Sequence, residues 1–284
     1  MQPFHFFASR RRSSALVATA LLAVLALGGC KKSEEESAPP PAVQLGTSAA
    51  VGNYLMDAAG NTLYYFSFDV SGSNSCGSAA CAAQWPVFYA PTLTVGAGLN
   101  AADFTASKTA GGENQTLYKG WPLSPVNGQN VREAAGQIRG EGYSSFWYVA
   151  RPDYTVMIAR ANITDNNTQV AAAKRYLIDP QGRTLYTYAK DDRLPTTQST
   201  NCTGSCATFW PVFYQEKFSG PSSLKPTDFG TITRTDGPNG ATRLQTTYKG
   251  RPLYYFAPDG NTRGKASGNN SAGPDAWTVA LVVP

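Results

Sequence analysis

The chain has 284 residues, 24 Lys and Arg against 19 Asp and Glu, and a formal net charge of +5. Its single histidine, His5, lies in a segment that we expect to be removed. The mature chain therefore has no histidine for a Ser-His-Asp or Cys-His nucleophile. The same lack excludes His-rich zinc and non-haem iron sites, as well as haem with histidine as its axial ligand.

The first 29 residues have the pattern of an export signal. Three arginines at 10–12 precede an apolar run at 14–27, which is too short to span a bilayer but suits a signal peptide. The tetrad Leu27-Gly28-Gly29-Cys30 resembles the bacterial lipobox, in which cleavage before the cysteine leaves that residue lipidated. We therefore predict a signal peptide over 1–29 and a lipid anchor on Cys30. Lysine at positions 31 and 32, by resemblance to the sorting rule of Gram-negative lipoproteins, favours the outer membrane.

Removal of this signal takes away three arginines and no acid, which lowers the formal net charge from +5 to +2. So small a charge does not favour a nucleic-acid partner. After Cys30 come Lys, Glu, Ser, Ala and Pro, a composition typical of disorder. We predict a disordered tether over 30–51 that separates the body from the membrane.

The rest of the chain is a tandem duplication. Residues 54–66 match 176–188, and Trp-Pro-Val-Phe-Tyr occurs at both 85–89 and 210–214. We predict two homologous domains, 52–150 and 169–284, joined by a linker over 151–168. A weaker repeat within each domain divides the body into four half-units. The second of these has lost its aromatic run, because Leu123-Ser124-Pro125-Val126 stands where Leu253-Tyr254-Tyr255-Phe256 does in the other domain.

The local pattern predicts β structure. Asp57-x-x-Gly60 lies between two aromatic and aliphatic runs, as a turn lies between hairpin strands. No segment of the mature chain has a helical period of apolar residues. We predict an all-β fold of two hairpin-rich domains, small sandwiches or barrels, with short helical turns at 79–84 and 207–209.

Three segments share the pattern Y-x-[FWY]-x-x-D, at Tyr64–Asp69, Tyr186–Asp191 and Tyr254–Asp259. Together with the cysteine pairs and the Trp-Pro that follows them, this pattern resembles the bacterial "secreted repeat" lipoproteins. The resemblance covers nearly the whole mature chain. It implies an envelope location and a repeat architecture, and it implies no particular reaction.

The four cysteines of the body form two matched pairs, Cys76 with Cys81 and Cys202 with Cys206. In an oxidising compartment such pairs are typical of disulfides, and we favour pairing within each copy because duplication gives self-contained units. Redox exchange or a Cu(I) thiolate site is the alternative.

The motif aspartates Asp69, Asp191 and Asp259 admit three interpretations. They could contribute to a carboxylate cation site, or form an acid–base pair of the glycosidase type. We favour the third interpretation, that each makes local turn hydrogen bonds at the end of a strand.

Adjacent aromatic residues of a motif strand point to opposite faces, so Tyr64 and Phe66 share one face and Tyr65 takes the other, and one of these faces is core. The remaining aromatic side chains are either cross-strand packing or an exposed face that stacks a sugar, porphyrin or quinone ring. We predict Trp85, Trp147, Trp210 and Trp277 as core anchors. Trp121, which is Arg251 in the other copy, is predicted to be exposed. The possible ligand face consists of Tyr64, Phe66, Tyr186, Tyr188, Tyr254 and Phe256.

These observations favour a non-catalytic, membrane-tethered binding module of the cell envelope, with an envelope protein or a glycan as its partner. Two linked modules raise avidity without new contacts. No cofactor and no metal site are predicted. The alternatives are an envelope redox accessory that binds a metal or an aromatic cofactor, and a carboxylate-based hydrolase of cell-wall glycan.

Overall fold

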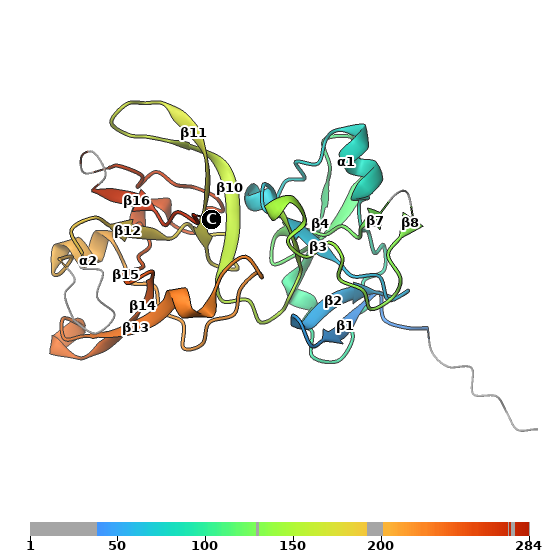
Figure 1. Ribbon diagram of the computed structural model, residues 1–284, viewed down its shortest axis with the longest axis horizontal. Helices are drawn as coiled ribbons and strands as arrows, with labels where there is room; N and C mark the ends of the chain where they lie inside the picture. The colour runs from blue at the N-terminus through green and yellow to red at the C-terminus, as the bar shows by residue number, and fades with distance from the viewer. Residues whose placement is uncertain (1–38, 129–130, 192–200, 272, 274–275, 284) are drawn as a thin grey trace, which may run out of the picture. The chain divides into compact units, whose positions relative to one another are not determined.

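Short antiparallel strands make up most of the regular structure in the computed structural model, which describes residues 39–128, 131–191, 201–271, 273 and 276–283 (Figure 1). The all-β prediction is confirmed, but the described strands form several small sheets and do not close into a barrel. The predicted signal peptide, Cys30 and the first part of the predicted tether lie outside these residues. The described residues from Pro40 onward form one compact unit.

The described residues of the first copy, 43–150, form three two-stranded sheets and one three-stranded sheet. Its elements are β1 (Val43–Ser48), β2 (Gly52–Asp57), β3 (Tyr64–Phe66), α1 (Ala79–Gln84), β4 (Phe104–Lys108), β5 (Asn114–Tyr118), β6 (Trp121–Pro122), β7 (Asn127–Gly128), β8 (Val131–Arg132) and β9 (Trp147–Val149). Strand β1 pairs with β2, β3 with β9, and β7 with β8, while β4, β5 and β6 form a three-stranded sheet.

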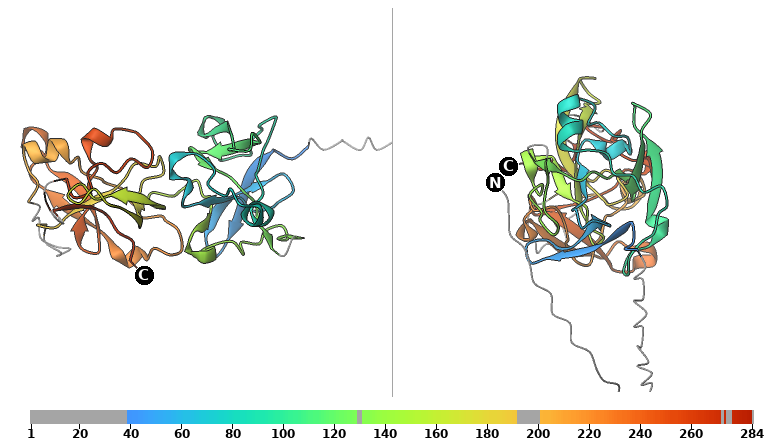
Figure 2. Two further views of the ribbon diagram at one scale, coloured as in Figure 1. Left: turned by 90° about the horizontal axis from the view of Figure 1, so that it is seen from above. Right: turned by 90° about the vertical axis from the view of Figure 1, so that its right-hand side faces the viewer.

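The second copy, residues 156–280, has the same order of strands, except that β7 and β8 have no counterpart among its described residues. Its elements are β10 (Met157–Thr164), β11 (Ala171–Ile178), β12 (Tyr186–Tyr188), α2 (Ser205–Phe209), β13 (Phe229–Arg234), β14 (Arg243–Tyr248), β15 (Arg251–Pro252) and β16 (Trp277–Val279). Strand β10 pairs with β11, β12 with β16, and β13, β14 and β15 form the three-stranded sheet. The duplication read from the sequence is therefore a duplication of topology. The two copies can be followed by their colours, blue to green and yellow to red, in Figures 1 and 2.

Short one-turn 3-10 helices connect these elements. They are η1 (Asp69–Ser71), η2 (Ala101–Asp103), η3 (Tyr143–Ser145), η4 (Pro226–Asp228), η5 (Pro238–Gly240) and η6 (Ala257–Asp259). The two predicted helical turns are present as α1 and α2. Among the described residues, no helix has both the length and the apolar character that crossing a bilayer requires.

Two predicted boundaries were wrong. The disordered tether was predicted to extend to residue 51, yet β1 begins at Val43 and pairs with β2 along its whole length. A linker was predicted over 151–168, yet residues 157–164 form β10, which pairs with β11. Both strands were missed because their sequences, VQLGTS and MIARANIT, carry no motif shared by the two copies. Their pairing with β2 and β11 makes them strands.

The predicted turn forms at Asp57. Its Oδ1 accepts the backbone N–H groups of Ala59 and Asn61 at 2.9 and 2.8 Å, and Gly60 has a φ of +83°. That positive φ is the reason for glycine at this position, since other residues rarely adopt it. Asp179 and Gly182 repeat this turn in the second copy, where the φ of glycine is +85°.

The four tryptophans predicted as anchors are buried in both copies. The indole rings of Trp85 and Trp147 stack at 3.9 Å, and those of Trp210 and Trp277 stack at 3.7 Å. In each copy this stack joins the α-helical segment to the last strand. The prediction of core anchors is confirmed.

The prediction that Trp121 is exposed was wrong. Its side chain is 2 % exposed, its Nε1–H donates to the carbonyl of Pro180, and the guanidinium of Arg263 lies 4.9 Å from its ring centroid. Arg263 also donates to the carbonyls of Lys119 and Gln181. Trp121 is buried because the second copy packs on it.

Arg251 occupies the equivalent place in the second copy and lines a surface hollow with Thr187, Tyr248 and Leu281. Its guanidinium donates to the carbonyl of Tyr188. The two positions differ because the second copy packs on Trp121, whereas Arg251 lines a surface hollow. An aromatic ring suits a junction between repeats, and a charged side chain suits the outer face of a terminal repeat.

Candidate functional site

The motif tyrosines of the second copy bind the motif aspartates reciprocally. The hydroxyl of Tyr186 donates to Oδ2 of Asp259 at 2.5 Å, and that of Tyr254 donates to Oδ2 of Asp191 at 2.6 Å. Tyr186 and Tyr254 face each other across an antiparallel bridge and are fully buried. Each Y-x-[FWY]-x-x-D segment therefore supplies the tyrosine for the aspartate of the other.

The second oxygen of each aspartate accepts from the loop that follows it. Oδ1 of Asp191 accepts from the backbone N–H of Asn201 at 2.7 Å, and Oδ1 of Asp259 accepts from the N–H of Ser267 at 3.0 Å. Burial raises the pKa of Asp191, and the hydrogen bond from Tyr254 opposes that rise. The favoured interpretation, local hydrogen bonding, holds for these loops, but the bonds to tyrosines in the other motif were not foreseen.

In the first copy, Glu133 takes the place of the missing aspartate. Its Oε1 accepts from the hydroxyl of Tyr64 at 2.6 Å, and its Oε2 accepts from the N–H of Arg139 at 2.9 Å. The N–H of Gly140 donates to Tyr64 as that of Gly268 donates to Tyr186. Burial raises the pKa of both Glu133 and Tyr64. No motif match marks Glu133, because the segment around it has diverged from the pattern.

Asp69 lacks a tyrosine at the equivalent position. Tyr64 pairs with Ser124 where Tyr186 pairs with Tyr254, and serine cannot extend a phenol hydroxyl toward Asp69. Oδ1 of Asp69 accepts from the N–H of Ser75 at 2.7 Å, and the residue is 2 % exposed. Burial raises the pKa of Asp69 to about 7, against a smaller lowering by Ser75.

The predicted aromatic ligand face is packed inside the fold. Tyr64, Tyr186 and Tyr254 are fully buried, with their hydroxyls on carboxylates. Phe66, Tyr188 and Phe256 are half-buried. Phe66 stacks on Trp147 at 4.4 Å, and Tyr188 stacks on Trp277 at 4.3 Å. The ring of Phe256 lies 4.4 Å from that of Trp210. Packing within the fold thus accounts for all six residues, and the interpretation as an exposed stacking strip was wrong.

The opposite side of β3 is equally closed. Tyr65 is fully buried, and its ring lies 5.0 Å from that of Trp121 and 5.6 Å from that of Tyr148. The second copy covers this side of the strand, so Tyr65 does not face solvent. The run Tyr64-Tyr65-Phe66 is continuous and does not alternate with polar residues, which is the pattern of a strand buried on both faces.

Both cysteine pairs form disulfides within their own copies, as predicted. Cys76 is bonded to Cys81 and Cys202 to Cys206. The backbone N–H of Trp85 donates to the carbonyl of Cys81, and that of Trp210 donates to the carbonyl of Cys206. Each disulfide therefore holds the turn that delivers a stacked tryptophan. Within the described ranges, no group of three or more His, Cys, Asp and Glu side chains is placed to hold a metal ion.

These features agree with a family model that matches part of the sequence. Three segments of the chain match the model described as a secreted repeat of unknown function. They are residues 47–89, 168–214 and 230–280, just under half of the chain. Each of the three contains one Tyr-x-[Phe/Tyr]-x-x-Asp segment with its tyrosine and aspartate. No curated protein and no solved structure matches the chain.

The second half of the first copy lies outside the three matched repeats, and it differs in shape as well as in sequence. Val126, in this half, stands where Phe256 stands in the third repeat. Beside it is a hollow of about 470 Å³, lined by Gln84, Val126, Gly128, Arg132, Glu133, Arg139 and Tyr143. Its volume lies in the range of small-molecule sites. We take it as the candidate functional site.

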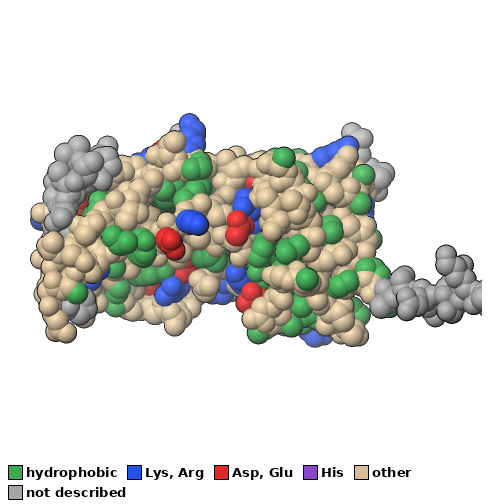
Figure 3. Space-filling model, turned by 90° about the horizontal axis from the view of Figure 1, so that it is seen from below, with side chains coloured by type: hydrophobic (Ala, Val, Ile, Leu, Met, Phe, Trp, Pro, Cys, Tyr) green, Lys and Arg blue, Asp and Glu red, His purple; other side chains and the backbone are tan. Residues whose placement is uncertain are grey.

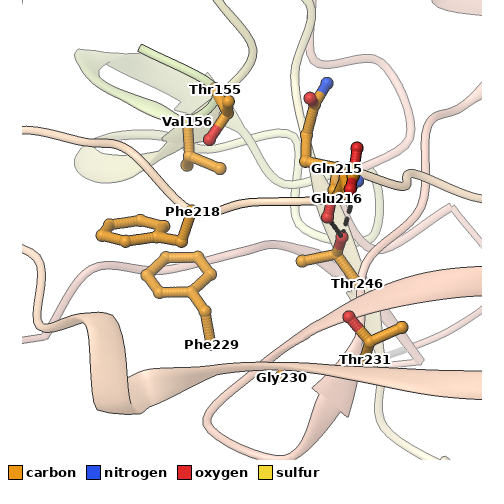
Figure 4. Close-up of a pocket in the computed structure, with 9 residues that line it drawn as sticks. All are labelled: Thr155, Val156, Gln215, Glu216, Phe218, Phe229, Gly230, Thr231 and Thr246. Atoms are coloured by element: carbon orange, nitrogen blue, oxygen red, sulfur yellow. Dashed lines mark hydrogen bonds between the residues drawn. The ribbon is translucent and has the colours of Figure 1, made fainter. Parts of the chain in front are cut away.

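Another hollow, in the second copy, is smaller. Figure 4 shows the stacked rings of Phe218 and Phe229, 4.1 Å apart, facing Gln215 and Thr246 across it. The N–H of Gln215 donates to Oγ1 of Thr246 at 2.9 Å. A volume of about 130 Å³ is below that of ordinary ligand pockets, so this hollow suits ordered water better than a ligand.

Charge does not single out a further site on the face drawn in Figure 3, where basic and acidic side chains are interspersed. The hollow beside Val126 has two basic residues of its own, Arg132 and Arg139. Sequence reasoning missed Gln84, Arg132, Arg139 and Tyr143. The only signal available was the loss of the aromatic run at 123–126, which marks where the first copy departs from the repeat.

Proposed function

We propose that the protein is a lipid-anchored envelope lipoprotein, held in the outer membrane through Cys30, that acts as a non-catalytic binding module. The observation that carries this proposal is that the candidate catalytic and metal-binding residues already bond to other parts of the fold. The motif aspartates of the second copy are bonded to buried tyrosines, and the four cysteines of the body are in disulfides. Groups committed in this way stabilise a scaffold, and the hollow beside Val126 supplies a place for a ligand.

The anchoring part rests on the sequence around Cys30. The Leu27-Gly28-Gly29-Cys30 tetrad follows an apolar run of signal-peptide length, and the matched repeat is described as secreted. Several acyl chains on one residue give stable attachment, because each buried CH2 contributes about 0.8 kcal/mol. Lys31 and Lys32 favour the outer membrane.

The test compares the wild-type chain with Cys30→Ala in a Gram-negative host. Mass spectrometry of the N-terminal peptide is expected to show acylated Cys30, and membrane fractionation is expected to place the wild type in the outer membrane. The Cys30→Ala variant is expected to be absent from the outer-membrane fraction. An unmodified Cys30 in a protein that is released from the membrane would overturn the anchoring.

The binding part is tested on protein extracted from the envelope in mild, non-reducing detergent. Native mass spectrometry is expected to show the chain with a bound small molecule or partner. Incubation with purified cell-wall glycan is expected to leave the glycan intact. Release of soluble glycan fragments would favour the hydrolase, and free thiols with bound copper would favour the redox accessory.

A further inference from the structure

The hollow in the first copy lies where the second copy places an aromatic ring. In the second copy the ring of Phe256 lies over that of Trp210, with centroids 4.4 Å apart. The first copy has Val126 at this position, and Val126 lines the hollow. Valine fills less of this position than phenylalanine does, and it carries no ring. The vacated space is therefore suited to a ring supplied by a ligand.

The aromatic wall of the hollow is Tyr143. Its side chain is 44 % exposed, and its ring meets that of Trp85 edge to face at 5.7 Å. Trp85 in turn stacks on Trp147, so Tyr143 rests on a rigid support. Edge-to-face and offset-stacked arrangements stabilise aromatic pairs beyond the area that they bury. A planar ligand that packs on Tyr143 extends the stack by one ring.

The polar wall is mainly basic. Arg132 and Arg139 both line the hollow. The side chain of Arg132 is 48 % exposed, and among the described residues its ion-pair contact is a long one, 3.8 Å to Asp57. Glu133 is the acidic group in the wall, but its two oxygens accept from Tyr64 and from the N–H of Arg139. The guanidinium groups are therefore the charged donors that remain for a ligand, and guanidinium binds carboxylate in a bidentate manner.

The second copy lacks this chemistry. Its counterpart of Arg139 is Ser267, which follows from the shared bonds of Gly140 to Tyr64 and Gly268 to Tyr186. The hydroxyl of Ser267 donates to Asp259, so the position is used within the fold. The ring space and the basic side chain therefore occur together in the first copy.

From these four observations we infer that the first-copy hollow binds an aromatic carboxylate, with its ring between Val126 and Tyr143 and its carboxylate on Arg132 and Arg139. The inference rests on the proposed binding function and names its ligand class. Affinity has two parts, the ring in the vacated space and the charge-assisted hydrogen bonds. Loss of one guanidinium is expected to weaken binding about tenfold, the effect of roughly 1.4 kcal/mol.

The experiment is isothermal titration of the full chain, purified from the envelope in a non-ionic detergent, with 2-naphthoate. Neutral 2-naphthamide and non-aromatic cyclohexanecarboxylate test the charge and the ring separately. We expect one molecule of 2-naphthoate per chain, with each of the other two compounds at least tenfold weaker. Equal binding of all three, or no binding of 2-naphthoate to the wild type, would overturn the inference.

Three variants locate the site. Val126→Phe restores the ring of the second copy and is expected to abolish binding. Arg139→Gln, at an exposed side chain, is expected to weaken binding about tenfold without affecting folding, so it decides the matter if Val126→Phe does not fold. Arg251→Gln is the matched control in the second copy and is expected to bind like the wild type. Unchanged binding in both Val126→Phe and Arg139→Gln would place the ligand elsewhere.

Failure of this inference is separable from failure of the proposed function. If 2-naphthoate does not bind while envelope-extracted protein carries another ligand in native mass spectrometry, the ligand class is wrong and the binding module stands. If the extracted protein cleaves glycan, the proposed function is wrong whether or not 2-naphthoate binds.

Discussion

The hydroxyl of Tyr254 lies 2.6 Å from Oδ2 of Asp191, although the two residues belong to different motif segments of the second copy. Tyr186 completes the exchange by donating to Asp259. The motif is therefore best understood as half of a symmetric pair. Its tyrosine and aspartate are needed together because each satisfies a buried group in the opposite half-unit, and a buried carboxylate without a donor is costly.

Tyr254→Phe is expected to destabilise the protein by about 1–3 kcal/mol, because Asp191 loses its buried phenol donor while the ring is kept. The measurement is the free energy of unfolding in urea. Tyr214→Phe, at an exposed tyrosine, is the control and is expected to change stability by less than about 0.5 kcal/mol. Equal stability of the two variants would show that the hydroxyl of Tyr254 contributes nothing.

Asp69 is expected to make stability depend on pH. Its pKa is raised to about 7 in the folded chain, above a value of roughly 4 in the unfolded chain, so the folded state holds an extra proton between these values. The free energy of unfolding therefore falls as the pH rises from about 4 to 7. Asp69→Asn removes this contribution.

The measurement for Asp69 is the urea midpoint at pH 4 and pH 8. The difference between the two midpoints is expected to be smaller in Asp69→Asn than in the wild type. Glu113→Gln, at an exposed acid, is the control and should keep the wild-type difference. Asp191 and Glu133, whose pKa values burial also raises, leave a residual dependence of the same sign in every variant.

The disulfides are expected to be structural. The chain-entropy relation for loops as short as those of Cys76–Cys81 and Cys202–Cys206 gives about 2 kcal/mol each. Replacing either pair by alanine is expected to cost about that amount in urea unfolding. A thiol assay on unfolded, unreduced Cys30→Ala, which removes the fifth cysteine, should detect no free thiol. Four thiols in that assay would contradict the disulfides and revive the redox interpretation.

Local signals predicted local structure well. The Asp57-x-x-Gly60 turn, the two short helices and the pairing of the cysteines all depend on residues close in sequence, and all are present. The repeat itself was readable because duplication leaves matched strings in the same order. These features need no knowledge of how the copies pack.

Features set by distant contacts were not readable. Glu133 replaces a motif aspartate only because the loop that carries it folds back to Tyr64, and neither its spacing nor its residue type matches the motif. The strand β10 shares no motif with β1, its counterpart in the first copy, yet pairing with β11 defines it. The hollow beside Val126 could not be predicted either, because it depends on how the loops of the first copy pack. Its relation to the ring of Phe256 is clear only when the two copies are compared.

Trp121 and Arg251 provide the sharpest test of the junction between the copies. Trp121→Arg is expected to destabilise the protein by at least about 3 kcal/mol, because it removes a buried ring and places a second guanidinium beside Arg263. The reciprocal change, Arg251→Trp, loses one bond to the carbonyl of Tyr188 at a half-buried site and is expected to cost less than about 1.5 kcal/mol. Urea unfolding of both variants makes the comparison. Similar losses would mean that the two positions are equivalent surface sites, and the second copy would then not be packed on Trp121 in solution.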